Sequence, residues 1–341
     1  MSGPVNKILV MRFSALGDVA MTVPVLKTFL ADHPEVEITM LSNQQFEGLF
    51  QGIERLQFLG ADMKGRHKGL IGIWRIYKMA KASAEFHAVA DLHGVLRTHV
   101  LRFLFRLDKK KTAVIDKGRL EKFALTRKDF KIFRPLKHST ERYAEVLNAL
   151  LPVPDSQLPI SISHLPTPNS QVPSPISIGF APFAKHNTKM YNLDRFKEVV
   201  KHFDSEPYKL YFFGGTPAER IMIRQWNKEF KQSVVIKEGI GLEKEMAIIG
   251  KLHVMVSMDS ANMHLASLAG VPVVSVWGPT HPYAGFYGVG QNPLNAVQLN
   301  LACRPCSVFG NKSCWRGDHA CMDGITPEMI IEKVEAVLKV I

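Results

Sequence analysis

Two acidic residues stand where short apolar runs give way to helical patterns. Asp18 ends the turn Phe13-Ser-Ala-Leu-Gly-Asp18 after the apolar run Lys7–Arg12, and Asp259 comes two positions after a similar run at 253–257. A carboxylate placed there can take a proton from a hydroxyl group; the alternative is that it only caps the helix. No Walker A motif accompanies these runs. The dinucleotide-binding fingerprint Gly-x-Gly-x-x-Gly is also missing, which disfavours an oxidoreductase. On position alone, both interpretations stay open for Asp18.

The block from Asp259 to Thr280 predicts an anion-binding site. It reads as a strand end, a helix, a Gly-Val-Pro exit and a second strand that ends in Gly-Pro-Thr. Backbone N–H groups of Ser260 and Ala261 would lie at the helix start, where they and the helix dipole attract phosphate. His264 follows one turn later and can add a donor. The alternative is a helix-capping aspartate with a surface histidine.

Two further loops carry charged groups after strand-like runs. Lys185 and Lys189 follow the run 176–180, where a pair of lysines can neutralise a diphosphate; plain solvated lysines are the alternative. Glu219 follows Phe213-Gly-Gly-Thr-Pro and falls in the first turn of a helix, where it either stabilises the helix dipole or accepts from ribose hydroxyls. Asn192 is predicted to be the N-cap of the next helix.

The elements that must hold these groups alternate between strands and helices. Apolar runs at 36–41, 56–58 and 88–92 are separated by helical patterns, including Val19–Leu30, where Pro24 predicts a kink. The same alternation restarts at 176. This predicts an α/β protein with two Rossmann-like, doubly wound domains, whose ligands bind at the carboxyl ends of strands in the cleft between them. The predicted boundaries are 1–165 for an acceptor domain, 166–175 for a linker, 176–324 for a donor domain, and 325–341 for a C-terminal helix that packs on the first domain.

The positive charge of the chain is concentrated in one stretch. The net charge is +12, and Lys64–Arg142 holds 21 Lys and Arg against 7 Asp and Glu. A solvated, locally disordered basic loop at 108–137 is one interpretation; an anionic membrane surface, an acidic acceptor or nucleic acid are the others. No recognised nucleic-acid-reading motif accompanies the charge, so we expect no nucleic acid. No apolar run is long enough to span a membrane and Met1–Asn6 is too short and polar for a signal peptide, so a cytoplasmic protein is expected.

All four cysteines fall in one C-terminal stretch. Cys303, Cys306, Cys314 and Cys321 have the spacing C-x2-C-x7-C-x6-C, enough thiolates for one structural zinc. The irregular later spacing favours unligated thiols over zinc. Disulfides are not expected in a cytosolic chain.

In order and spacing, these motifs resemble glycosyltransferase family 9, the bacterial lipopolysaccharide heptosyltransferases, which have the GT-B architecture. The resemblance runs from Lys7 to the C-terminal helix. The segment Asp91-Leu-His-Gly-Val-Leu-Arg97-Thr98 resembles the family's Asp-x-x-Gly-x-x-Arg-Ser, and the cysteines followed by Ile325-Thr-Pro-Glu328 resemble the tail of many members. This sequence departs from the pattern at Tyr191-Asn192, where Trp-Pro is usual, and at Ser260-Ala261, which replace Thr-Gly.

The resemblance implies an inverting transfer of heptose from an ADP-sugar to the lipopolysaccharide inner core, with no required metal or cofactor. It implies that Asp18 is the base, that Lys189 contacts the donor phosphates and that Glu219 contacts the donor ribose. The residues implied around the donor sugar and phosphates are Asp259, Ser260, Ala261 and His264. Because Lys185 lies on the same loop as Lys189, we expect it to be a second donor-binding lysine.

A phosphorylated, membrane-embedded glycolipid is an anionic acceptor, which fits the basic stretch. We therefore expect a protein that associates peripherally with the inner face of the inner membrane. The predicted acceptor contacts are Ser14, Lys64, Arg66, Lys68 and Arg97. Two alternatives stay open: another GT-B enzyme that acts on a UDP-sugar, either a transferase or an epimerase, and a nucleotide- or nucleic-acid-binding protein without turnover.

Overall fold

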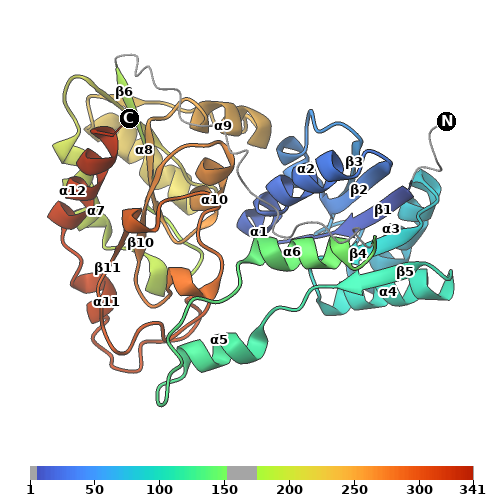
Figure 1. Cartoon of the computed structure of the whole chain (residues 1–341). Helices are drawn as coiled ribbons and strands as arrows, with labels where there is room; N and C mark the ends of the chain where they lie inside the picture. The colour runs from blue at the N-terminus through green and yellow to red at the C-terminus, as the bar shows by residue number, and fades with distance from the viewer. Residues whose placement is uncertain (1–5, 152–174, 341) are drawn as a thin grey trace. The chain divides into compact units, whose positions relative to one another are not determined.

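The chain folds into two compact units, seen here in a computed structural model that describes residues 6–151 and 175–340 (Figure 1). Unit 1 comprises Met1–Gly118, Lys137–Ile162 and Gly241–Glu243, and unit 2 comprises Arg119–Leu136, Ser163–Ile240 and Lys244–Ile341. The predicted linker at 166–175 lies, apart from its last residue, outside the described residues. Each unit is built around one parallel sheet, which confirms the predicted α/β class.

The sheet of unit 1 has the strand order β3-β2-β1-β4-β5, and all its neighbouring strands are parallel. Its strands are β1 (Asn6–Met11), β2 (Val36–Asn43), β3 (Leu56–Ala61), β4 (Ala88–Asp91) and β5 (Lys111–Val114). Four of them match predicted runs. Strand β5 was not predicted, because its short sequence Lys-Thr-Ala-Val lies in the basic stretch and has no buried alternation. The expectation of a disordered loop at 108–137 is therefore wrong for this strand.

Helices cover both faces of the unit 1 sheet. They are α1 (Leu16–Ala20), α2 (Thr22–Asp32), α3 (Gly69–Ser83), α4 (Leu96–Leu107) and α6 (Ser139–Asn148), with a 3-10 turn, η1, at Gln44–Leu49. Helix α2 packs on α6, and α3 packs on α4. The predicted helical run breaks at Met21, because Pro24 has no N–H to donate to the carbonyl of Ala20. Gly17, expected in a tight turn, lies inside α1.

The sheet of unit 2 has the strand order β11-β10-β9-β6-β7-β8 and is also parallel throughout. Its strands are β6 (Ile176–Ala181), β7 (Tyr208–Phe212), β8 (Ser233–Val234), β9 (Val254–Met258), β10 (Val273–Trp277) and β11 (Ala296–Gln298). The helices that follow in this half of the chain are α7 (Leu193–His202), α8 (Pro217–Glu229), α9 (Leu242–Ile249), α10 (Ala261–Leu268), α11 (Ala320–Asp323) and α12 (Pro327–Leu338). The strands predicted at 176–180 and 253–257 are present, as are the helices predicted after Asn192, at Glu219 and after Asp259; β11 was not predicted.

Helix α12 completes the core of unit 2. It packs against α7, β9, β10 and β11, and Ile330 and Val334 are fully buried in the same apolar cluster as Val276. Burying these side chains, spaced i and i+4, gives the helix one apolar face. This differs from the expectation that the C-terminal helix packs on the N-terminal domain.

The segment that carries α5 (Arg119–Thr126) belongs to unit 2, although it interrupts the sequence of unit 1. Lys131 donates to the carbonyl oxygens of Cys303 and Pro305, both at 2.9 Å. The ring of Phe133 lies 5.0 Å from that of His281. These contacts correct the predicted first boundary, which placed the segment in the N-terminal domain.

Candidate functional site

In unit 1, Asp18 is paired with the arginine that follows strand β1. Arg12 Nη2 lies 2.7 Å from Asp18 Oδ2, and the same oxygen accepts the N–H of Ala15 at 3.1 Å. Asp18 is the third residue of α1, so it stabilises the start of that helix without being its N-cap. The Arg12 side chain is only 9% exposed, whereas that of Asp18 is 37% exposed. Water and a substrate can therefore reach the carboxylate.

Arg12 is held in place from two further sides. Its Nη1 donates to the carbonyl oxygen of Leu92 at 2.6 Å, and its guanidinium lies 5.6 Å from the ring centre of Tyr143. The Tyr143 hydroxyl in turn donates to the backbone oxygen of Asp18 at 3.4 Å. Contacts from β4 and α6 thus fix the cation that orients Asp18.

The histidine after β4 lies beside the same turn. His93 Nε2 is 3.4 Å from Ser14 Oγ, and its backbone N–H donates to the fully buried Asp91 at 3.0 Å. Burial, with the positive charges of Arg12 and Lys117, lowers the pKa of His93 to about 3. The imidazole is therefore neutral near pH 7 and can exchange a hydrogen bond with the Ser14 hydroxyl. His93 lies within the Asp91–Thr98 motif, but the sequence pattern predicted no role for it.

In unit 2, the predicted donor-binding groups Lys189 and Asp259 meet directly. Lys189 Nζ lies 3.1 Å from Asp259 Oδ2, and the two side chains are 12% and 4% exposed. Lys189 ends the 3-10 turn η2 (Asn187–Lys189), and Asp259 follows β9. A Cβ at Gly310 would lie 2.3 Å from Lys189 Cγ, so glycine is required there for the loop to pack on the lysine. Asp259 on one side and the loop at Gly310 on the other therefore hold Lys189 in place.

Helix α10 begins at the predicted anion site. Ser260 is its N-cap, and the Ser260 hydroxyl lies 3.3 Å from the hydroxyl of Ser257. Ala261 is the first helical residue, and His264 is buried on the following turn. The predicted arrangement of strand, Asp-Ser turn and helix is therefore confirmed.

Glu219 and Asn192 both act as caps. Glu219 Oε2 accepts the N–H groups of Gly215 at 2.7 Å and Thr216 at 2.9 Å, and the Thr216 hydroxyl accepts the N–H of Glu219. This is a capping box at the start of α8. A carboxylate has further acceptor capacity beyond these two bonds. Asn192 accepts from two backbone N–H groups at the start of α7, as predicted.

A buried arginine that sequence reasoning missed organises the loop after β10. Arg304 is 4% exposed, and its guanidinium donates to three carbonyl oxygens of that loop, those of Trp277, Gly278 and Thr280. It also donates to Leu299 and to the side chain of Gln298. Burial lowers the pKa of Arg304 to about 10, still well above neutrality. Arg304 thus fixes the Gly-Pro-Thr segment that the sequence placed in the donor site.

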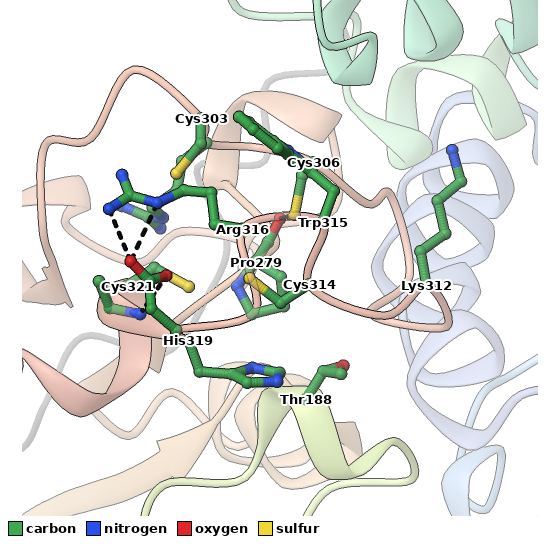
Figure 2. A pocket seen from close by; sticks show the side chains of 13 residues that line it. Thr188, Pro279, Cys303, Cys306, Lys312, Cys314, Trp315, Arg316, His319 and Cys321 are labelled. Carbon is green, nitrogen blue, oxygen red and sulfur yellow. Dashed lines mark hydrogen bonds and ion pairs between the residues drawn. The ribbon is translucent and has the colours of Figure 1, made fainter.

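The four cysteines line one small cavity in unit 2 (Figure 2). They are free thiols, and no group of three or more His, Cys, Asp or Glu among residues 6–151 and 175–340 is arranged to hold a metal ion. Burial raises the pKa of Cys306 and raises that of Cys321 to about 11, which favours the protonated thiols. The structure therefore gives no support to the predicted zinc alternative.

The other predicted contacts are spread over both units. Lys185 is exposed on the loop after β6, separate from the buried Lys189–Asp259 pair. Lys64, Arg66 and Lys68 are exposed on the loop before α3, and Arg97 lies partly exposed in the first turn of α4. Among the described residues, no helix is both long and apolar enough to cross a membrane.

Each unit is a parallel α/β sheet with a pair of charged side chains beyond the carboxyl ends of its strands, which is where such sheets bind phosphate-bearing ligands. Comparison with known proteins then gives the family. The model of glycosyltransferase family 9 (heptosyltransferase) matches residues 75–313, so the chain belongs to this family and is a glycosyltransferase.

Individual relatives support this assignment over the whole chain. The lipooligosaccharide heptosyltransferase 2 of Campylobacter jejuni is 21% identical over 95% of this chain and 96% of its own. A family 9 glycosyltransferase structure from Veillonella parvula has a TM-score of 0.74 at 21% identity, with 100% and 99% of the chains covered. The E. coli heptosyltransferase WaaC, solved with ADP, has a TM-score of 0.68 at 18% identity, with 97% and 99% covered. The two structures share the fold of this chain.

Proposed function

We propose that this enzyme transfers a heptose from an ADP-sugar to the inner core of lipopolysaccharide, with inversion at the anomeric carbon. The observation that carries the proposal is the pairing of Arg12 with a half-exposed Asp18, in a chain that belongs to the heptosyltransferase family. Named relatives act on lipooligosaccharide or lipopolysaccharide, and one neighbour is solved with ADP. No metal or cofactor is required in this scheme.

Asp18 accepts the proton of an acceptor hydroxyl in the proposed step. The hydroxyl oxygen forms a bond to the anomeric carbon, and the bond from that carbon to the diphosphate breaks on the opposite face. Arg12 orients Asp18 through their ion pair. Ser14, with His93 beside it, and the basic residues Lys64, Arg66, Lys68 and Arg97 are proposed to bind the phosphorylated acceptor.

Unit 2 is proposed to bind the donor and to stabilise its departing charge. Lys189, with Lys185, and the backbone N–H groups at the start of α10 neutralise the diphosphate, an electrostatic contribution that dominates many such reactions. Glu219 accepts from the ribose hydroxyls. Asp259 and His264 position the sugar and the phosphates, and Arg304 holds the adjoining loop.

The test compares the Asp18→Asn variant with Asp32→Asn, a matched change at an exposed residue of α2 in the same unit. Turnover of ADP-heptose on lipopolysaccharide from a strain that lacks this enzyme should fall at least about a hundredfold in Asp18→Asn. ADP affinity, measured by calorimetry, should stay unchanged in both variants. Retained turnover in Asp18→Asn would exclude Asp18 as the base.

The donor and the acceptor have their own readouts. Tighter binding of UDP than of ADP to the wild-type protein would contradict the proposed donor. Mass spectrometry of lipopolysaccharide from a deletion strain should show an inner core that lacks one heptose, and an unchanged core would contradict the proposed acceptor.

A further inference from the structure

The outward side of helix α3 carries large apolar side chains that the core does not use. Leu70, Ile71 and Trp74 are 78%, 70% and 47% exposed, whereas Ile73 and Ile76 on the opposite side are buried. Exposed apolar side chains that cluster on one surface mark interaction sites, while single ones do not. We call the surface formed by Leu70, Ile71, Trp74, Arg75 and Lys78 the α3 face.

Positive charge surrounds these apolar side chains. Between Met63 and Ala84 the chain has six basic residues and no acidic residue. Lys78 Nζ lies 5.5 Å from the ring centre of Trp74, and Arg75 donates to the carbonyl oxygen of Arg66. Tryptophan beside lysine and arginine suits the boundary between lipid headgroups and acyl chains, because each side chain has an apolar body and a polar end.

The loop before α3 is held in one conformation. The Asp62 carboxylate accepts the backbone N–H groups of Lys64, Gly65 and Arg66 at 2.9–3.2 Å. The buried His67 accepts the N–H of Asp62 at 3.0 Å. Because the loop is already ordered, its exposed basic residues are presented next to the α3 face without a large cost in conformational entropy.

We propose that the α3 face binds the surface of an anionic phospholipid bilayer, with Leu70, Ile71 and Trp74 inserted between the headgroups. A free phosphorylated sugar would use the charges but leave the apolar side chains exposed, whereas an anionic bilayer satisfies both. The proposal gives a location to the membrane association expected for an enzyme with a lipid-linked acceptor, and in that respect it rests on the proposed function.

Vesicle sedimentation with the full-length chain tests the proposal. Wild-type protein should bind vesicles of phosphatidylethanolamine and phosphatidylglycerol, bind weakly to phosphatidylcholine vesicles, and be released at high salt. The double variant Leu70→Glu/Ile71→Glu removes two inserted apolar side chains, and each removal should weaken vesicle binding by at least about tenfold. Lys78→Gln should weaken binding about fivefold.

Matched controls lie in unit 2. Leu294→Glu changes a leucine that is 75% exposed, and Lys228→Gln changes an exposed lysine of α8. Both should bind vesicles as the wild type does. All variants should keep the wild-type melting temperature and the wild-type turnover on a deacylated, water-soluble acceptor.

Three results would overturn the proposal. The first is vesicle binding by Leu70→Glu/Ile71→Glu that equals that of the wild type, and the second is an equal loss of binding in Leu294→Glu. The third is that Leu70→Glu/Ile71→Glu changes the oligomeric state but not the vesicle binding, which would assign the face to a second copy of the chain. The proposed function fails separately: a wild-type protein that binds vesicles but transfers no heptose contradicts the function and leaves the α3 face intact.

Discussion

The two units each hold a carboxylate against a cation just after a strand, yet the two pairs differ in burial. Arg12 and Asp18 in unit 1 are 2.7 Å apart, with the carboxylate 37% exposed. Lys189 and Asp259 in unit 2 are 3.1 Å apart, with the carboxylate 4% exposed. In unit 1 the cation is the buried partner and the carboxylate faces water. In unit 2 the carboxylate is buried and the lysine is only 12% exposed.

This difference in burial assigns a different task to each carboxylate, although both residues are aspartates. A carboxylate that exchanges protons with a substrate must be reached by it, which suits Asp18. A buried carboxylate that pairs with a lysine holds that lysine in one position, which suits Asp259. A diphosphate that binds Lys189 must then share the lysine with Asp259. Substitutions in either pair can test whether this difference in burial matters.

The largest expected effect comes from removing the cation of each pair. Lys189→Met should destabilise unit 2 by about 3–5 kcal/mol, because it leaves Asp259 buried and unpaired. Arg12→Met should destabilise unit 1 by only about 1–2 kcal/mol, because water can solvate Asp18. Hydrogen exchange of β1 and β9 under native conditions reports the two units separately. Equal losses would show that burial does not distinguish the pairs.

A second effect concerns the loop beside the buried pair. Arg304→Lys should destabilise unit 2 by about 3 kcal/mol and weaken ADP binding, because an ammonium group has three donors and cannot replace the guanidinium fork at its five acceptors. Arg316→Lys, an exposed arginine paired with Asp318, is the matched control and should change neither property. Unchanged ADP affinity in Arg304→Lys would remove Arg304 from the donor site.

The effect that is smallest near neutral pH is a pH dependence in unit 1. The pKa of His93 is about 3 in the folded chain, so the unfolded chain, with an ordinary pKa near 6.5, binds the extra proton first as the pH falls. Stability should therefore fall between about pH 6.5 and about pH 3, with a slope of up to about 1.4 kcal/mol per pH unit from this group. Urea unfolding of wild type and His93→Gln should show a shallower slope in the variant. Identical slopes would mean that His93 is already solvated.

Much of the fold followed from local patterns, because apolar runs and helical spacing act over a few residues. In unit 2 the strands at 176–180 and 253–257, the helices that follow them and the cap at Asn192 were predicted. Strand β5 was missed, since pairing with β4 stabilises it more than any feature of its own sequence. The membership of helix α12 and of the α5 segment in unit 2 did not follow from local patterns, because their packing partners are distant in sequence.

The site residues also divide into those that local patterns predicted and those that they did not. Lys189 and Asp259 were chosen for their positions after strands, and the structure brings them into contact. Arg12, His93 and Arg304 were missed as site residues. Arg12 meets Leu92 across 80 positions of sequence, and Arg304 meets Trp277 across 27. No local pattern reports such contacts.

The sequence by itself determined the order of the elements, the two parallel α/β halves and the charged residues at the ends of their strands, because these depend on local spacing and on chain direction. Only the tertiary structure decided which of those charges are buried, which cation pairs with each carboxylate, and that α3 keeps an apolar face in solvent. Burial and pairing depend on contacts between residues far apart in the chain, and those contacts exist only once the sheets and helices have packed.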